Sequence, residues 1–213
     1  FCDSRVDNCR YDVFREMVKA GCRIIYFGIE SANQRILDYY KKGITPDESR
    51  SAVNKARKAG VDIIVGSFIV GAPDETRKEV ENTLKFALEL DIDVPQLNIL
   101  GAFTGTDLWN DLVAKGFINE DALWETGAYV TQVSPHAVPF EELRSQVYDY
   151  FKGFVLRPRL IVTEALRTVK SPFRFAGVVH NLARINSIID TVTEGIRYDM
   201  ASQPVDVNTQ LKP

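Results

Sequence analysis

The sequence predicts an α/β protein whose parallel sheet alternates short apolar strands with amphipathic helices. Apolar runs of strand length, such as residues 62–70, contain almost no polar residue, which is typical of strands covered on both faces. Between these runs, apolar residues recur every three or four positions, the spacing of one helix face. Helix and strand alternate to about residue 116. This alternation indicates right-handed crossovers, either in a barrel or in an open doubly wound sheet.

A repeated pattern places the first two of these strands. The sequence Lys-Ala-Gly-x-x-Ile-Ile occurs at residues 19–25 and again at residues 58–64. Each copy has the form of a helix end, a terminating glycine and a strand start. We therefore expect strands at residues 23–30 and 62–70, each preceded by a helix.

The second strand leads into the most informative segment, Ser67–Thr76, which reads Ser-Phe-Ile-Val-Gly-Ala-Pro-Asp-Glu-Thr. The strand ends at Gly71, and Asp74 and Glu75 stand at the start of a helix. That helix carries four apolar residues on one face: Val80, Leu84, Ala87 and Leu88. α/β proteins place ligand-contacting loops at this position. An ordinary turn with helix-capping acids explains the same residues, so the segment alone leaves both interpretations open.

A further strand is predicted at residues 94–100. It is followed by a glycine- and threonine-containing loop, Gly101–Thr106, and by a helical run that ends at Gly116. Four apolar residues of that run follow helical spacing: Leu108, Trp109, Leu112 and Val113.

After Pro135 the sequence becomes helical without a clear strand. Apolar residues follow helical spacing over residues 140–154, and two Pro-containing breaks, near Pro158 and Pro172, separate this run from two shorter ones. We therefore expect three parts: an α/β domain at residues 1–134, a helical appendage at residues 135–200, and a poorly ordered polar tail at residues 201–213.

Composition describes a globular chain. The 213 residues are 45% hydrophobic and 26% charged, and the formal net charge of −3 gives no electrostatic sign of nucleic-acid binding. No apolar run approaches the roughly 20 residues that span a bilayer, so no membrane association is expected. The three cysteines lie within the first 22 residues and form no disulfide framework, which favours a reducing, cytoplasmic compartment. Because the first residue is Phe, we expect the chain to be part of a longer protein.

Glu30 and Ser31 are the first candidate site residues, because they stand at the carboxyl end of a predicted strand. In a barrel that end forms the active-site face. An acid that complements a helix dipole is the structural alternative for Glu30, and the mid-strand Gly28 indicates either a close approach of a ligand or a bulge.

Metal and histidine chemistry are not predicted. Cys2, Cys9 and Cys22 have no zinc or iron–sulfur spacing, and His136 and His180 lie far apart. We expect none of these five side chains to bind a metal.

Four segments in succession resemble the radical S-adenosylmethionine superfamily. They are Ala20-Gly-Cys-Arg-Ile-Ile-Tyr-Phe-Gly-Ile-Glu-Ser31, then Ile36-Leu37 with Lys42-Gly43 and Thr45, then Ser67–Thr76, then Thr104-Gly-Thr106. The resemblance covers roughly residues 1 to 116. Residues 150–159 are also similar to the helix after the barrel in the branch with an N-terminal cobalamin-binding domain, which includes the anaerobic magnesium-protoporphyrin monomethyl ester cyclases.

The resemblance implies a partial (β/α) TIM-like barrel, of which this chain holds parallel strands 3 to 6. Residues 1–6 correspond to the third strand and residues 23–30, 62–70 and 94–100 to the next three. The Cys-x3-Cys-x2-Cys loop that binds a four-iron four-sulfur cluster in this family is absent from the sequence. An exposed barrel edge at residues 1–6 leads us to expect self-association or strand rearrangement through this segment.

The resemblance also assigns site residues. It implies that Glu30 and Ser31 contact the ribose or methionyl part of the cofactor, with Asp74 and Glu75 bracing the loop. The remaining contacts that it implies are Ser67, Ile69, Gly71, Leu100 and Gly101 around the adenine, and Arg5 near a carboxylate. A barrel-rim ion pair is the alternative for Arg5. Two departures put the loop shapes in doubt: Asp74 replaces a glycine, and Phe103-Thr104 replaces Tyr-Pro.

The function implied is that of part of an iron–sulfur enzyme that cleaves S-adenosylmethionine reductively to a 5′-deoxyadenosyl radical and activates a C–H bond of a small-molecule substrate. The cofactors are S-adenosylmethionine, the cluster, with ligands outside this chain, and cobalamin in the branch named above, for methylation or oxidative cyclisation. Two alternatives stay open. A non-radical barrel enzyme would bind a phosphorylated molecule through residues 101–105, and a degenerate barrel would be a non-catalytic interaction domain.

Overall fold

The structure is a computed structural model that describes residues 1–119, 130–131 and 138–182. Two compact units are distinguished: Phe1–Ile99 with His136–Phe175, and Leu100–Pro135 with Ala176–Pro213. The first unit contains the parallel sheet and the candidate site, and each unit is described by itself.

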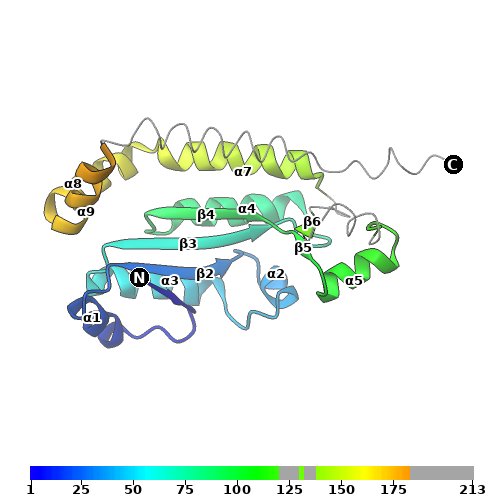
Figure 1. Ribbon diagram of the computed structural model, residues 1–213, viewed down its shortest axis with the longest axis horizontal. Coiled ribbons are helices and arrows are strands. Elements are labelled where there is room, and N and C mark those ends of the chain that lie inside the picture. The colour runs from blue at the N-terminus through cyan, green and yellow to red at the C-terminus, as the bar shows by residue number, and fades with distance from the viewer. Residues whose placement is uncertain (120–129, 132–137, 183–213) are drawn as a thin grey trace. The chain divides into compact units, whose positions relative to one another are not determined.

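The first unit is built on a four-stranded parallel sheet in the order β1-β2-β3-β4 (Figure 1). Its strands are β1 (Cys2–Ser4), β2 (Ile24–Glu30), β3 (Ile63–Val70) and β4 (Val94–Ile99). Each strand pairs with the next in the chain, so the predicted α/β fold with sequential parallel strands is confirmed.

Helices connect the strands: α1 (Tyr11–Lys19), α2 (Gln34–Tyr39), α3 (Pro46–Ala59) and α4 (Arg77–Glu89). Their ends follow local chemistry. Thr45 with Glu48 begins α3 and Thr76 with Glu79 begins α4, each pair forming a capping box. Gly60 ends α3 with a left-handed φ of 94°, as the repeated glycine pattern predicts.

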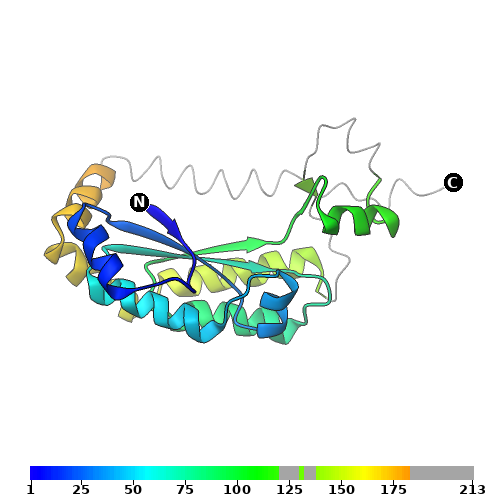
Figure 2. The ribbon, with the colours of Figure 1, turned by 90° about the horizontal axis from the view of Figure 1, so that it is seen from below.

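One face of the sheet carries the hydrophobic core. Figure 2 shows α3, α4 and α7 (Phe140–Val155) on the same side of the strands. Fully buried strand residues that face these helices are Ile25, Phe27, Ile29, Ile64 and Phe68. They pack against small and aromatic helix residues, among them Phe14, Ala52, Ala56, Phe86 and Ala87. Val70 and Leu84 belong to a second hydrophobic cluster, which also contains Leu143 of α7.

The other face of the sheet is more open within the described part of the chain. Tyr26, Gly28, Ser67 and Ile69 alternate with the core residues and are half-buried. The apolar run at residues 62–70 predicts a strand covered on both faces, whereas the described residues cover one face fully. Ser67 and Ile69 are therefore accessible from the open face.

The helical sequence after Pro135 folds as α7, α8 (Pro158–Lys170) and α9 (Pro172–Leu182). The two predicted proline breaks fall between these helices. Residues up to 175 lie in the same compact unit as the sheet, so the division at residue 134 stays a prediction. The predicted tail at residues 201–213 lies outside the described residues.

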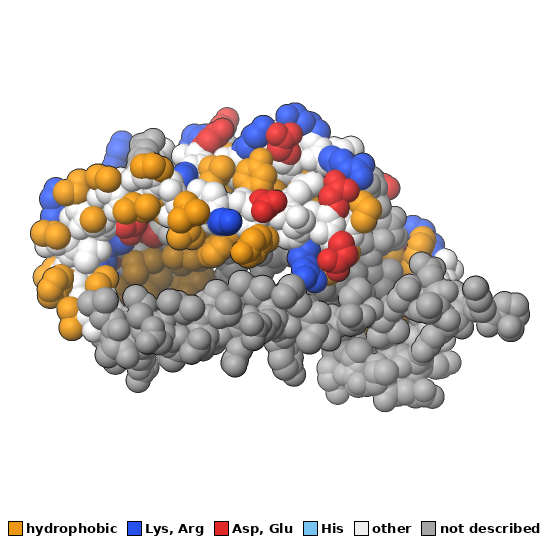
Figure 3. Space-filling view, turned by 90° about the horizontal axis from the view of Figure 1, so that it is seen from above, with side chains coloured by type: hydrophobic (Ala, Val, Ile, Leu, Met, Phe, Trp, Pro, Cys, Tyr) orange, Lys and Arg blue, Asp and Glu red, His pale blue; other side chains and the backbone are white. Residues whose placement is uncertain are grey.

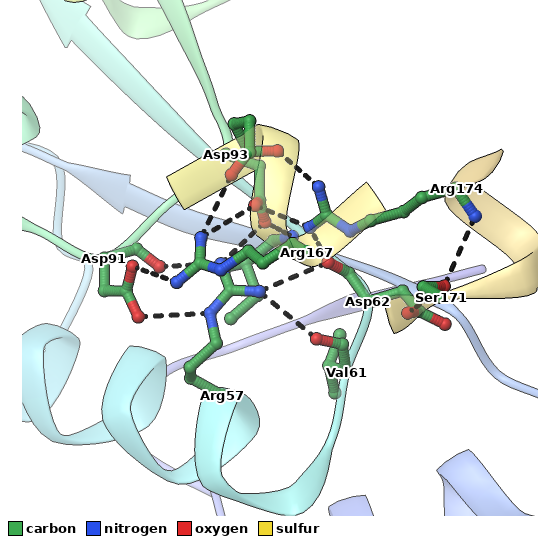
Figure 4. A network of polar contacts seen from close by, with 10 residues as sticks. Arg57, Val61, Asp62, Asp91, Asp93, Arg167, Ser171 and Arg174 are labelled. Carbon is green, nitrogen blue, oxygen red and sulfur yellow. Dashed lines mark hydrogen bonds and ion pairs between the residues drawn. The ribbon is translucent and has the colours of Figure 1, made fainter. Parts of the chain in front are cut away.

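A network of ion pairs fastens α8 and the start of α9 to the amino-terminal ends of β3 and β4 (Figure 4). Asp93, with a side chain 4% exposed, receives hydrogen bonds from Arg57 and Arg174 at 2.6 Å each and from Arg167 at 3.1 Å. Its Oδ2 also accepts the Ile64 N–H at 2.6 Å. Burial works to raise the pKa of Asp93, but Arg57 and Arg174 hold that pKa below its ordinary value.

The described residues of the second unit form a short antiparallel pair and a helix. β5 (Ala102–Phe103) pairs with β6 (Val130–Thr131), and α5 (Asp107–Ala114) begins at the Thr106 cap. The helix confirms the predicted run before Gly116. The β5–β6 pair was not predicted, because two-residue strands carry no detectable periodicity.

Candidate functional site

Glu30 ends β2 in an unusual backbone conformation. The register of β2 against β3 shifts between Gly28 and Glu30, and Glu30 has φ 64°, in the left-handed region that non-glycine residues rarely adopt. Its side chain is 11% exposed, and Oε1 lies 2.6 Å from the Lys42 ammonium. Such local strain persists where neighbouring contacts fix it, and it is concentrated at functional sites.

Gly28 makes room for this ion pair. A Cβ atom at Gly28 would lie 2.8 Å from Oε1 of Glu30 and 2.9 Å from Nζ of Lys42, both closer than real contacts allow. The sequence left two explanations for Gly28, a close approach or a bulge. The structure shows both, and what approaches the glycine is the Glu30–Lys42 pair.

Three buried polar atoms have no hydrogen-bond partner among the described residues. They are Glu30 Oε2, the Tyr40 hydroxyl and Glu75 Oε1. Glu30 is the last residue of β2, and Tyr40 and Glu75 belong to segments that follow β2 and β3. Because a buried polar atom without a partner is energetically costly, these three atoms are candidates for hydrogen bonds with a ligand.

Glu75 holds the loop after β3. Its Oε2 accepts the N–H groups of Gly71 at 2.6 Å and Ala72 at 3.0 Å, and the residue is 1% exposed. Burial raises the pKa of Glu75 despite these two hydrogen bonds. Burial, followed by the Glu75 carboxylate, also raises the pKa of Tyr40. The bracing that the resemblance implies for Glu75 is what its geometry does.

Asp74 has φ 59° and presents its carbonyl to the Arg35 guanidinium at 3.0 Å. Arg35 also binds the Glu79 carboxylate through two nitrogens, at 2.8 and 2.6 Å. These contacts attach the loop after β3 to α2.

Ser31 is fully buried and turned toward α4. Its hydroxyl lies 3.0 Å from the Thr83 hydroxyl and accepts the Asn33 N–H at 3.1 Å. Ser31 follows Glu30 in the sequence, but its hydroxyl belongs to a buried hydrogen-bond network with Thr83 and Asn33. Its predicted contact with a cofactor stays a prediction.

An open hollow of about 410 Å³ lies on the exposed face of the sheet. It is lined by Asp3, Ser4, Arg5, Tyr26, Phe27, Gly28, Lys42, Ser67 and Gln96. Arg5 binds both oxygens of Asp7 and donates to the Lys42 carbonyl at 2.8 Å. Of the two roles considered for Arg5, the rim ion pair is present, while its contact with a ligand stays a prediction.

The other predicted contacts are distributed along the sheet. Ser67 lines the hollow, Ile69 is half-buried on the same face, and Gly71 ends β3 with φ 88°. Leu100 and Gly101 belong to the second unit, so the structure does not join them to the strand-end residues.

Sequence reasoning did not assign Lys42, Tyr40 or Thr83 to the site. Lys42-Gly43 occurs within the segments that carry the family resemblance, which could have indicated Lys42. Nothing in the local sequence marks Tyr40 or Thr83, since their roles arise from packing between distant elements.

Neither a metal centre nor a membrane span was found among the described residues. No group of three or more His, Cys, Asp or Glu side chains there could hold a metal ion, and the three cysteines are free. His136 lies outside the described residues. No helix in the described part is long and apolar enough to cross a bilayer.

Comparison with known proteins identifies similar sequences and folds. The radical SAM superfamily matches residues 2–87. An uncharacterized methyltransferase of Pyrococcus horikoshii is 39% identical over 165 residues, covering 76% of this chain and 35% of that protein. The bacteriochlorophyllide d C-8(2)-methyltransferase of Chlorobaculum tepidum is 28% identical over 178 residues, covering 79% of this chain and 37% of the relative.

Among solved structures, coproporphyrinogen III oxidase from Escherichia coli, a radical SAM enzyme, aligns with a TM-score of 0.50 and 15% identity. The alignment covers 71% of this chain and 31% of that one, and it supports the fold alone. The chain spans about a third of the length of the two curated relatives described above.

Proposed function

We propose, from the premise that residues 2–87 belong to the radical SAM superfamily, that this chain is part of an iron–sulfur enzyme that binds S-adenosylmethionine at the carboxyl ends of β2 and β3. The observation that carries the proposal is Glu30. Its Oε2 is a buried acceptor without a partner in the part of the chain that the structure describes, at the strand end where α/β proteins bind ligands.

The chemistry of this end of the sheet fits the cofactor. S-adenosylmethionine carries ribose hydroxyls and an ammonium group, which are donors, and a carboxylate, which is an acceptor. Glu30 Oε2 would accept from a donor, while Lys42 holds Oε1 and supplies positive charge at the rim of the hollow. Glu75 keeps the Gly71–Ala72 backbone fixed beside them.

No described residues fit the cluster. The free cysteines do not form a ligand set with other side chains, so the cluster ligands would come from outside this chain. When bound, cluster and cofactor together supply a carbon-centred radical that removes a hydrogen atom from a substrate. The described residues would bind and orient the cofactor.

For the overall reaction, we propose methyl transfer to a small molecule, with cobalamin as a further cofactor. Both curated relatives described above are methyltransferases, which favours methylation over oxidative cyclisation. A cobalamin-binding domain elsewhere in the whole protein, a cytoplasmic location, self-association through β1 and the absence of nucleic-acid or membrane partners remain predictions. The superfamily match weighs against a non-radical barrel enzyme and against a non-catalytic interaction domain.

The test is the affinity for S-adenosylmethionine, measured by calorimetry in the whole protein with its cluster rebuilt. Charge-assisted hydrogen bonds contribute about 1.5–3 kcal/mol, so Glu30→Gln should weaken binding roughly tenfold or more. Glu89→Gln, which alters an exposed ion pair with Arg50, is the matched control and should bind normally. Unchanged affinity in Glu30→Gln, together with lower thermal stability, would make Glu30 a structural acid and overturn the proposal.

A further inference from the structure

The turn that follows Glu30 is tight and held from outside β2. Glu30 has the left-handed φ of 64°, and the Ser31 N–H closes back on the Ile29 carbonyl at 2.8 Å. A glutamate in this conformation is strained and remains there only if the residues around it are fixed. The source of that constraint is therefore a functional question.

Thr83 of α4 supplies one part of the constraint. Its hydroxyl oxygen accepts the Ala32 N–H at 3.2 Å and a hydrogen of the Asn33 side-chain amide at 3.1 Å. It also lies 3.0 Å from the Ser31 hydroxyl. Since a hydroxyl has two lone pairs and one hydrogen, donation to Ser31 would complete its bonding capacity. Thr83 is 0% exposed, so water cannot replace these contacts.

Asn33 supplies the second part. Its amide nitrogen donates to the Glu79 carbonyl at 2.8 Å, and its side-chain oxygen accepts from the Asn82 amide at 3.2 Å. Each of the three residues after Glu30 therefore forms a hydrogen bond with a residue of α4. We call Asn33 and Thr83 together the α4 latch.

We propose that the α4 latch is a positioning device for Glu30, and that Thr83 sets cofactor affinity without touching the cofactor. The inference rests on the proposed function. Thr83 is buried on α4, on the core side of the sheet, whereas Gly28 and Lys42 line the hollow on the open side and Lys42 binds Glu30. Among the described residues, Thr83 contacts the segment after Glu30 through the Ala32 N–H and through the side chains of Ser31 and Asn33. The same helix begins with the cap that follows the Glu75 loop, so α4 fixes the segments after both strands.

The substitution that tests this is Thr83→Val, which keeps the shape of the side chain and removes its hydroxyl. In the whole protein we expect at least a fivefold loss of S-adenosylmethionine affinity and faster amide hydrogen exchange in residues 29–34. Thr83→Ser keeps the hydroxyl, so its cofactor affinity and its amide hydrogen exchange in residues 29–34 should match those of the wild type. Thr163→Val on α8 is the matched control and should change neither. If Thr83→Val does not fold, Thr83→Ala removes the same hydroxyl with less bulk.

A double-mutant cycle separates positioning from a merely structural role. If Thr83 acts through Glu30, adding Thr83→Val to Glu30→Gln should cause little further loss of affinity. Two results would overturn the latch inference, provided that Glu30→Gln binds the cofactor weakly. One is that the affinity losses of Thr83→Val and Glu30→Gln add in the double variant. The other is that Thr83→Val has normal affinity and only a lower melting temperature. Normal affinity in Glu30→Gln itself would instead show that the proposed function has failed, and the latch inference would fail with it.

Discussion

Gly28→Ala should separate cofactor binding from stability. The new methyl group would lie 2.8 Å from Glu30 Oε1 and 2.9 Å from Lys42 Nζ, so the ion pair must move off the strand. Both atoms are the ends of flexible side chains, 11% and 25% exposed, and they can move without displacing the backbone. Gly28 does not have a left-handed φ, so alanine fits the backbone there.

The expected change in the free energy of unfolding is small because two effects oppose each other. Replacing glycine by alanine at a compatible site stabilises by ~0.4–1 kcal/mol through the unfolded chain. Displacing a pair of partly exposed charges costs about 1 kcal/mol. The net change should lie within about 1 kcal/mol of zero. Affinity for S-adenosylmethionine should fall roughly tenfold, since Glu30 no longer presents Oε2 at the strand end.

Gly66→Ala is the matched control on the core face of the neighbouring strand. There the methyl group would meet Phe68 at 3.0 Å and Ile29 and Ile92 at 3.1 Å each, inside the packed core. Overpacking of this kind costs about 1–3 kcal/mol. Urea denaturation would measure the two stabilities and calorimetry the affinity. Normal affinity in Gly28→Ala, or a stability loss as large as that of Gly66→Ala, would refute the reasoning.

Two further predictions concern buried acids. Asp93→Asn should lower the free energy of unfolding by about 3–5 kcal/mol, because three arginines lose a buried charge partner. The pKa of Asp93 is lowered in the folded state, so the stability that its carboxylate contributes is present above the ordinary pKa and is lost as pH falls through the folded-state pKa. Urea denaturation at pH values from 6 to 2 would follow this loss. Equal stability of the variant and the wild type at pH 6 would contradict the prediction. The pKa of Glu75 is raised in the folded state, so ionisation of Glu75 opposes folding above the ordinary pKa. As pH rises from 4 to 7, Glu75→Gln should therefore gain stability relative to the wild type. A stability difference between the two proteins that stays constant over that range would count against the raised pKa.

The strands were predictable because their apolar periodicity is local. β2, β3 and β4 each begin or end within about one residue of the predicted ranges, as strand boundaries allow. The glycines at the ends of α1 and α3 could also be assigned, since left-handed helix ends strongly favour glycine. The position of Glu30 at a strand end followed from the same local pattern.

The contacts around Glu30 were not predictable in this way. Lys42 reaches Glu30 from a turn twelve positions along the chain, and Thr83 reaches Ser31 from α4. Both contacts depend on how helices pack over the strands, which no local pattern encodes. Ser31 illustrates the limit: its position in sequence suggests an exposed strand-end hydroxyl, but packing turns it inward.

The two ends of the sheet differ in how fully their charges are matched. At the amino-terminal end, Asp93 is surrounded by three guanidinium groups and a backbone N–H, so that end is electrostatically complete (Figure 4). At the carboxyl end, acceptors on Glu30 and Glu75 remain open among the described residues. Among the coloured side chains of Figure 3, acidic and basic residues are interspersed, with no large field of one sign. A ligand with hydrogen-bond donors would therefore distinguish the two ends of the sheet by their unsatisfied acceptors rather than by long-range charge.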